Sequence, residues 1–322
     1  MSIEPLQWEL DVAEPEFRNR STVRMKKREK RIDALLKQVL VPPGKKISLK
    51  KDYDPGWKPE TVDKEESIKL LDQGIELLAE FQDKLYAQDH YALLIIFQAM
   101  DAAGKDGAIK HVMSGLNPQG CQVYSFKAPS SEELDHDYLW RCFKALPERG
   151  RIGIFNRSYY EEVLVTKVHP EIIQKQRIPV EFKDKKVYER RYEEINNFEK
   201  YLFSNGIVPV KFFLNVSKDE QKRRFLDRIN RDEKNWKLSP ADAKERGHWD
   251  AYMSAYEDCF RATSTKWAPW HVIPADNKWV SRLSVAAIVH RRLAELKLAY
   301  PRVSKEQKAA LLETKTMLES EK

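Results

Sequence analysis

The feature that most constrains the fold is a run of apolar residues that leads directly into a loop of glycine, lysine and aspartate. Residues 91–98 read YALLIIFQ. A continuous apolar run of this length predicts a strand buried on both faces of a parallel sheet. The run continues into AMDAAGKDG (99–107), which a helical pattern follows. Such a loop between strand and helix directs backbone N–H groups at one point, so we expect a phosphate-binding loop here.

Five consecutive residues of this loop are the predicted phosphate contacts. They are Ala103, Gly104, Lys105, Asp106 and Gly107. The Lys105 ammonium adds a positive charge to the backbone N–H groups. Two opposite unit charges about 4 Å apart attract by roughly 4 kcal/mol at an effective dielectric constant near 20. The loop therefore favours an anionic ligand.

The loop departs from the usual phosphate-loop pattern. Ala99 stands where the first glycine is expected, and Asp106 stands where a serine or threonine hydroxyl normally holds Mg²⁺. Asp101 places a further carboxylate inside the loop. Because a carboxylate beside phosphates is repulsive unless a divalent cation lies between them, we interpret Asp101 as a Mg²⁺ ligand. The alternative, an ordinary turn rich in aspartate and glycine, is less favoured because a buried strand precedes it and Lys105 follows Gly104.

The rest of the chain alternates between strand and helix patterns. Further strands are predicted at 122–126, 151–155, 208–216 and 271–275, and helices at 132–146, 184–203, 218–229, 240–262 and 278–298. This alternation predicts an α/β protein, a three-layer α/β/α sandwich with a mainly parallel sheet.

Three parts are expected along the chain. Residues 1–63 form an N-terminal extension with a basic amphipathic helix (22–41) and an extended connector (45–60). Residues 64–300 form the main domain, which begins with a helix at 64–88 and includes a lid at about 223–245. Residues 301–322 form a charged, helix-prone tail.

A second polar cluster follows the strand predicted at 151–155. In open α/β sheets ligands collect at the carboxyl ends of strands, so this cluster should face the phosphate loop. The guanidinium of Arg157 suits the oxygens of a phosphoryl group in transfer. Asn156 and Glu161 are candidates to orient metal-bound water or a second Mg²⁺. An ordinary strand-end cap with surface charges is an equally good interpretation of Glu161, and a poorer one of Arg157.

The segment SFKAPSSEELDHDYLWR (125–141) lies between these two clusters and is the expected wall of an acceptor-nucleotide site. The predicted nucleotide contacts, two of which come from the second cluster, are Lys127, Asp135, Trp140, Arg141, Asn156 and Tyr160. A tryptophan at such a position is more often a core residue than a base-stacking one.

A group of cations is predicted to form a lid. Arg224, Arg228, Arg231 and Lys234 follow i+4, i+3 and i+3 spacing, so on one helix they share a face, and Arg223 and Lys237 extend the group. A polyanion would neutralise their repulsion, and closing such a lid would exclude water from the phosphoanhydride. The competing interpretation is a solvated helix face, because acidic residues lie among the cations.

Composition favours an anionic partner without naming it. The net charge is +7 and the pI is about 9.0, which suits nucleic acid, a membrane surface or a polyanionic substrate equally. No recognisable nucleic-acid module and no apolar run of membrane-spanning length is present, so we expect neither partner. Three scattered cysteines and the absence of a signal-peptide pattern at the N-terminus predict a cytoplasmic protein.

Four ordered motifs, MDAAGKDG, SFKAPSSEELDHDYLWR, GIFNRSYYEEVLV and RDEKNWKLSPAD, make the chain resemble the polyphosphate kinase 2 family. The resemblance covers roughly residues 47–298. It implies a thymidylate-kinase-like P-loop kinase fold with a helical lid. It also implies Mg²⁺ dependence, with Mn²⁺ as a substitute, and reversible phosphoryl exchange between inorganic polyphosphate and adenine or guanine nucleotides. A homo-oligomer, either dimer or tetramer, fits the family.

The resemblance also implies roles for single residues. Asp101 would bind metal, and Lys105 and Arg157 would bind phosphate. The lid cations that would bind polyphosphate are Arg228, Arg231, Lys234 and Lys237. Many family members carry aspartate where this chain has Asn156, and FNRSYYEE is more similar to the branch that accepts both nucleoside mono- and diphosphates.

Two other functions stay open from the sequence. One is an ATP-dependent nucleoside monophosphate kinase of the P-loop class. The missing loop hydroxyl and the extended cationic lid weigh against it. The other is a basic nucleic-acid-binding protein with a degenerate P-loop, which the charge permits but no module supports.

Overall fold

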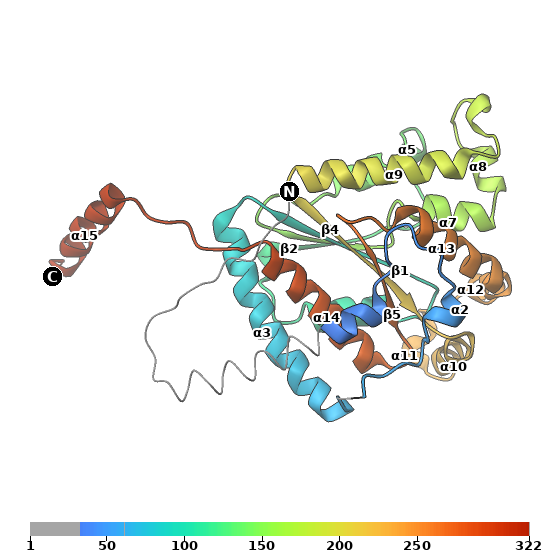
Figure 1. The fold of residues 1–322 in the computed structure, drawn as a ribbon, viewed down its shortest axis with the longest axis horizontal. Helices are drawn as coiled ribbons and strands as arrows, with labels where there is room; N and C mark the ends of the chain where they lie inside the picture. Colours follow the sequence, from blue (N-terminus) through green and yellow to red (C-terminus); the bar gives the residue numbers. More distant parts are fainter. Residues whose placement is uncertain (1–32, 61, 322) are drawn as a thin grey trace.

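The computed structural model describes residues 33–60 and 62–321, and its centre is one sheet of five strands. The strands are β1 (Ala92–Ala99), β2 (Cys121–Ser125), β3 (Ile152–Asn156), β4 (Ile207–Asn215) and β5 (Trp270–Pro274). They run in the order β2-β3-β1-β4-β5, and every pair of neighbours is parallel (Figure 1). All five predicted strands are confirmed, each within one residue of its expected bounds.

β1 is the central strand of the sheet. All eight of its residues are buried. It pairs with β3 on one side and β4 on the other, which places Leu93 between Ile152 and Val208. The apolar run accounts for this burial, since a strand of a parallel sheet that is covered on both faces needs apolar side chains at successive positions.

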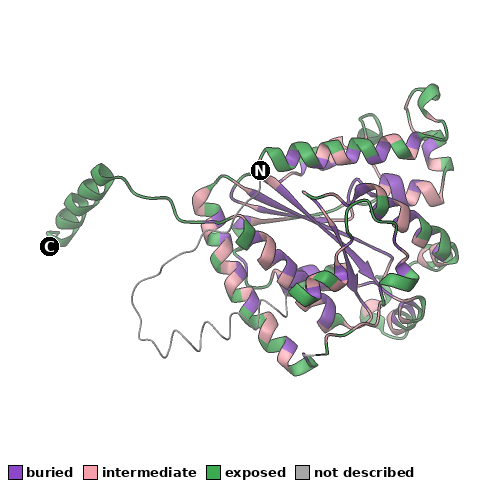
Figure 2. Ribbon diagram, viewed as in Figure 1, coloured by how far each residue is buried: buried purple, intermediate pink, exposed green. Residues whose placement is uncertain are grey.

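Helices cover both faces of the sheet, so the predicted three-layer α/β/α fold is confirmed (Figure 1). On one face α14 (Lys278–Glu295) contacts α3 (Lys64–Gln88) and α4 (Lys105–Val112). On the other face α13 (Trp249–Thr263) contacts α7 (Glu161–Val168) and α9 (Val187–Ser204). Figure 2 shows the buried strands between these two layers, whose outer surfaces are exposed.

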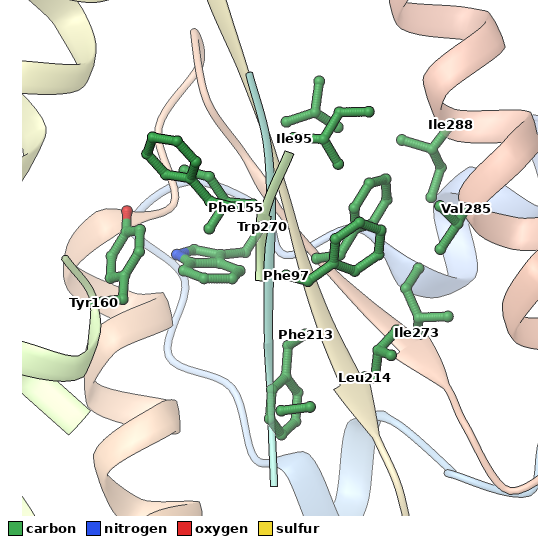
Figure 3. Packing of buried hydrophobic residues seen from close by; sticks show 14 of the residues in the cluster. Ile95, Phe97, Phe155, Tyr160, Phe213, Leu214, Trp270, Ile273, Val285 and Ile288 are labelled. Atoms are coloured by element: carbon green, nitrogen blue, oxygen red, sulfur yellow. The ribbon is translucent and has the colours of Figure 1, made fainter. Parts of the chain in front are cut away.

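Aromatic and branched side chains fill the space between the sheet and its helices (Figure 3). The rings of Phe97 and Phe212 stack with centroids 5.2 Å apart, and those of Phe260 and Trp270 lie 5.0 Å apart. A rigid, water-free core of this kind fixes the strand ends at which polar loops begin.

Further helices complete the described part of the chain. They are α2 (Leu49–Asp52), α5 (Ser131–Leu134), α6 (Trp140–Lys144), α8 (Glu171–Lys175), α10 (Lys218–Ile229), α11 (Asp232–Asn235), α12 (Pro240–Glu245) and α15 (Lys305–Glu319), with 3₁₀ turns η1 (Pro118–Gly120), η2 (Val180–Phe182) and η3 (Arg246–His248). Within residues 33–60 and 62–321 no helix is long and apolar enough to cross a membrane.

Three helix predictions need correction. The helix expected at 132–146 is two short helices, because Asp137 Oδ1 accepts from the Leu139 backbone N–H and forms a turn between them. The helix expected at 240–262 is α12 and α13, with η3 between them. The cationic lid is not one helix, because α10 ends at Ile229 and Arg231 stands at the N-terminus of α11.

The two ends of the chain differ from the domain. The predicted basic helix at 22–41 falls largely outside the described residues, and residues 33–39 of it are helical. The connector expected at 45–60 contains α2. The tail forms α15, which is exposed along its length and lies apart from the rest of the molecule (Figures 1 and 2).

Candidate active site at the carboxyl edge of the sheet

The loop that follows β1 has the backbone shape of an anion cradle. Ala102 has φ 60° and Gly104 has φ 109°, both in the left-handed region. Gly104 is the N-cap of α4, and glycine adopts this conformation without the strain of a side chain. The first turn of α4 therefore presents unpaired N–H groups toward the loop, where helix geometry favours an anion.

Lys105 is the first residue of α4 and lies among charged groups. Its Nζ donates to the Ala99 carbonyl oxygen at 3.1 Å. Burial lowers the pKa of the Lys105 ammonium and Arg157 lowers it further, whereas the carboxylates of Asp101 and Glu161 oppose both effects. A bound phosphate would also favour the charged ammonium.

The strand-end cluster and the loop meet, as predicted. Arg157 Nη2 donates to Asp101 Oδ1 at 3.0 Å, and Asn156 Nδ2 donates to Asp106 Oδ1 at 2.8 Å. Arg157 itself has a φ of 65°, a strained value for a non-glycine residue, and its backbone N–H donates to Phe97 O at 2.9 Å. Backbone strain of this kind concentrates at functional sites.

Glu161 begins α7 and faces the same charges. Burial raises the pKa of this carboxyl, and Arg157 and Lys105 lower it in part. The side-chain amide nitrogen of Gln98, in the orientation that satisfies its neighbours, donates to Glu161 Oε1 at 2.7 Å. Gln98 is not among the site residues predicted from the sequence. A polar residue at the end of an otherwise apolar strand was the available signal.

The donor set suits Mg²⁺ that is shared with phosphate oxygens. Among the described residues, no three carboxylate, histidine or cysteine side chains converge into a cage made by protein alone. Mg²⁺ usually takes one or two carboxylates, with waters and substrate phosphates as its other ligands. Asp101, beside the cradle, fits that role, and Asn156 and Glu161 flank it.

The predicted acceptor wall is only partly assembled. Arg141 Nη1 donates to the Lys127 carbonyl oxygen at 2.8 Å, and Asp135 pairs with Arg177. The ring of Trp140 stacks on His136 with centroids 3.9 Å apart. The predicted wall residues therefore make separate local contacts along the loop and α6 and do not all contact one another.

The prediction that Tyr160 contacts the nucleotide does not agree with its surroundings. Tyr160 has 0% exposure, and its hydroxyl donates to Glu199 Oε1 at 2.7 Å. Lys211 Nζ donates to the same hydroxyl at 2.8 Å. Its side chain is part of the core, and no surface of it is left for a ligand.

A cavity of about 550 Å³ adjoins this wall. Arg141 and Asp135 contribute to its lining, together with the apolar side chains of Leu139, Ile178 and Phe182. The sequence analysis did not single out 176–194, which forms the opposite side. A mixed polar and apolar lining of this size is typical of a small-molecule site.

The lid cations are placed differently from the prediction. Arg228 Nη1 donates to the Lys237 carbonyl oxygen at 3.0 Å, and Lys234 Nζ lies 2.7 Å from Asp227 Oδ2. Arg231 pairs with Glu233 across 2.5 Å. Arg228 lies in the last turn of α10, Arg231 and Lys234 lie at the start of α11 and within it, and Lys237 lies in the turn that follows α11.

Arg224 does not belong with the other lid cations. It is buried, and it turns toward the phosphate loop rather than toward solvent.

This sheet order, with a phosphate-type loop after the central strand and a cation at the next strand end, defines a P-loop kinase-like α/β fold. The family model "Polyphosphate kinase 2 (PPK2)" matches residues 61–300. The chain therefore belongs to the polyphosphate kinase 2 family.

Individual relatives agree with that family. An "ADP-polyphosphate phosphotransferase" of Rhodopseudomonas palustris is 50% identical over 286 residues, which are 88% of this chain and 98% of the relative. An "AMP/ADP-polyphosphate phosphotransferase" of Meiothermus ruber is 42% identical over 236 residues, which are 73% of this chain and 83% of the relative. The crystal structure of polyphosphate kinase 2 from Arthrobacter aurescens TC1 is 39% identical, covers 85% of this chain and 98% of its own, and superposes with a TM-score of 0.75.

Proposed function

We propose that this protein is a polyphosphate:nucleotide phosphotransferase that moves a terminal phosphoryl group reversibly between inorganic polyphosphate and AMP or ADP. Family membership and the names of two relatives support the reaction. The single observation that carries the site is the Asp101 carboxylate inside an anion cradle, 3.0 Å from Arg157 and beside Lys105. The location of the protein in the cytoplasm and its assembly as a dimer or tetramer stay predictions.

The donor end of polyphosphate would bind in the cradle. Backbone N–H groups of 103–107 and the Lys105 ammonium would hold its oxygens, and Arg157 would contact the phosphoryl group in transfer. Asp101, with Asn156 and Glu161, would hold Mg²⁺. When bound, this cation supplies charge neutralisation between the carboxylates and the phosphates.

The chemistry needs no protein nucleophile. An oxygen of the acceptor's terminal phosphate attacks the terminal phosphorus of polyphosphate in line. A new anhydride bond forms as the old one breaks, and the shortened polyphosphate leaves with its electron pair. Lys105 and Arg157 lower the barrier by fixing the two ends and by stabilising charge on the phosphoryl oxygens.

The acceptor nucleotide would bind along the second polar segment. Lys127, Asp135, Trp140, Arg141 and Asn156 remain the proposed contacts. The cavity beside Arg141 supports them, because it is close to the same wall and large enough for a nucleoside. The names of two relatives differ in the acceptor nucleotide, which is ADP in one and AMP or ADP in the other. We propose that this chain accepts both, with adenine and guanine as bases.

The lid would bind the rest of the polyphosphate chain. Arg228, Arg231, Lys234 and Lys237 lie on the exposed segment 228–237, and each of the first three already has a polar partner in the protein. Exchanging those weak surface pairs for phosphate oxygens costs little, since exposed ion pairs contribute about 0–1 kcal/mol. We further propose that 64–300 act as the catalytic domain and that the ends of the chain are accessory.

An assay without ATP tests this function. Purified protein is incubated with AMP, ADP or GMP, each with long-chain polyphosphate and Mg²⁺, and products are separated by chromatography. The proposal predicts ADP from AMP and ATP from ADP. An ATP-dependent nucleoside monophosphate kinase would form no ADP from AMP without ATP, and any ATP that it formed from ADP would appear with an equal amount of AMP and would not depend on polyphosphate. Either of these results would reject the proposal.

A further inference from the structure

The start of α10 holds the backbone of the phosphate loop through three consecutive carbonyl groups. Gln221 Nε2 donates to the Asp101 carbonyl oxygen at 2.9 Å. Arg224 Nη1 donates to the carbonyl oxygens of Ala102 at 2.9 Å and of Ala103 at 2.8 Å. Two side chains one helical turn apart therefore bind every carbonyl between the Asp101 carboxylate and Gly104.

The orientation of these carbonyls decides which way the loop amides point. In a planar trans peptide the C=O and the following N–H point in opposite directions. Because the carbonyls of Asp101, Ala102 and Ala103 face α10, the N–H groups of the same three peptides, those of Ala102, Ala103 and Gly104, face away from it. The Ala103 N–H is used within the loop, where it donates to the Met100 carbonyl oxygen at 3.3 Å. A flip of the Asp101–Ala102 or the Ala103–Gly104 peptide would turn a partially negative oxygen toward a bound phosphate.

The loop backbone is strained at the point where Arg224 holds it. Ala102 has a φ of 60°, a left-handed conformation that is unfavourable for a residue with a Cβ. Such strain persists only where surrounding contacts oppose it. The paired hydrogen bonds from Arg224 are contacts of that kind.

Arg224 has no donor left for a substrate. A guanidinium carries five N–H donors. Besides the two loop carbonyls, Nη2 donates to the carbonyl oxygens of Ala275 at 2.6 Å and of Asp276 at 3.2 Å, and Nε donates to Glu220 Oε1 at 2.7 Å. The side chain is buried. It thus connects the loop after β1 to the end of β5 through α10.

We propose that Arg224 and Gln221 are positioning residues, which hold the phosphate loop in the form that presents its N–H groups to polyphosphate. This replaces the predicted role of Arg224 as a lid cation that binds polyphosphate directly. The proposal rests on the proposed phosphotransfer only for its kinetic readout.

The test separates the fork geometry of the guanidinium from its charge. Arg224→Lys keeps the positive charge but cannot reach two pairs of carbonyls at once, and Arg224→Met removes both. Gln221→Met is a milder variant that removes one loop contact. Arg223→Met is the matched control, because Arg223 also pairs with Glu220 but is exposed and touches no loop carbonyl.

Three measurements are made on each folded variant: kcat and KM with ADP and polyphosphate, hydrogen exchange of the peptide spanning 99–107, and the thermal midpoint. We expect kcat to fall about 100-fold in both Arg224 variants, the loss typical of misplaced backbone donors, and roughly 10-fold in Gln221→Met. Loop amides should exchange at least ~10-fold faster in the Arg224 variants. In Arg223→Met, loop exchange should match the wild type.

Two results would overturn the proposal. If Arg224→Lys kept kcat within about threefold of the wild type, charge rather than fork geometry would be what the site needs. If loop exchange stayed unchanged in both Arg224 variants, the residue would anchor α10 alone. A wild-type protein without polyphosphate-dependent turnover would reject the proposed function instead, while the exchange comparison would still decide the role of Arg224.

Discussion

Two cation–carboxylate pairs in this molecule have similar chemistry and very different surroundings. Lys211 and Glu199 lie 2.7 Å apart with both side chains at 0% exposure. Arg157 and Asp101 lie 3.0 Å apart with 38% and 31% of their side chains exposed. The first pair is inside the layer between the sheet and α9, and the second is at the carboxyl edge of the sheet.

The buried pair is fully satisfied by the protein. The three N–H donors of Lys211 go to Glu199 at 2.7 Å, the Thr263 carbonyl at 2.7 Å and the Tyr160 hydroxyl at 2.8 Å. Glu199 also accepts from the hydroxyls of Tyr159 at 2.8 Å and Tyr160 at 2.7 Å. A buried network in which every donor is used stabilises one specific packing of the core and leaves no donor free to bind a ligand.

The open pair is accessible to a ligand. Because water reaches both Asp101 and Arg157, the pair contributes little to stability and its partners are free to exchange. The comparison teaches that burial, rather than residue type, separates a structural pair from the pair that we propose to be catalytic. Four predictions sharpen or break that distinction.

The largest effect is expected from Lys211→Met. It leaves the Glu199 carboxylate buried without its cation, which should lower the free energy of unfolding by about 3–5 kcal/mol. Urea denaturation measures the change. A double variant that also replaces Glu199 by Leu should recover part of the loss. A single variant within about 1 kcal/mol of the wild type would contradict the structural role.

At the open pair, Asp101→Asn should affect turnover and spare stability. We expect phosphotransfer to fall roughly 10²–10³-fold, equivalent to about 3–4 kcal/mol, while the free energy of unfolding changes by less than about 1 kcal/mol. The matched control is Asp258→Asn, since Asp258 pairs with Lys167 at a similar exposure away from the loop. Equal losses of turnover in the two variants would remove any special role for Asp101.

The sequence predicted more of the sheet than of its polar connections, for a physical reason. The strand at 92–99 and the loop after it are local patterns, so both were found. The buried position of Tyr160 depends on Glu199, which is 39 residues away in the sequence. The orientation of the Arg224 side chain depends on the Ala103 carbonyl, which is 121 residues away. Spacing along a helix revealed that Arg224 and Arg228 share a face, but it held no information on which of them meets another element.

A pH dependence of stability is expected on the buried side. Burial lowers the pKa of His271, whose Nδ1 lies 3.2 Å from the Lys211 carbonyl oxygen, from 6.5 to about 4. As pH falls, the unfolded chain binds a proton near pH 6.5 before the folded protein does, so stability is lost between pH 6.5 and 4. The loss from this group is about 3 kcal/mol at pH 4.

The check compares the wild type with His271→Asn, which keeps a donor near the same carbonyl and does not titrate. Unfolding free energies are measured from pH 7 to pH 4. The variant should show a shallower decline with acid. Parallel curves for the two proteins would mean that His271 does not contribute.

The smallest effect concerns the acid side of the activity profile. Burial raises the pKa of Glu161, so this carboxyl gains a proton at a higher pH than an exposed glutamate. Because we propose that its ionised form helps to hold Mg²⁺, kcat should fall as pH decreases through that raised pKa. Excess Mg²⁺ should shift this acid limb of the pH–kcat profile to lower pH. Glu161→Gln should flatten this limb, and an unchanged limb would assign it to another group.

The central claim is that Asp101 lies inside the anion cradle because a divalent cation joins it to the substrate. The most direct test is a crystal structure with Mn²⁺ and tripolyphosphate, in which anomalous scattering locates the metal. We predict that Asp101 leaves Arg157 and binds the metal at about 2.1 Å, with phosphate oxygens as further ligands. A fully occupied site in which Asp101 stays paired with Arg157, away from both metal and phosphate, would contradict the account.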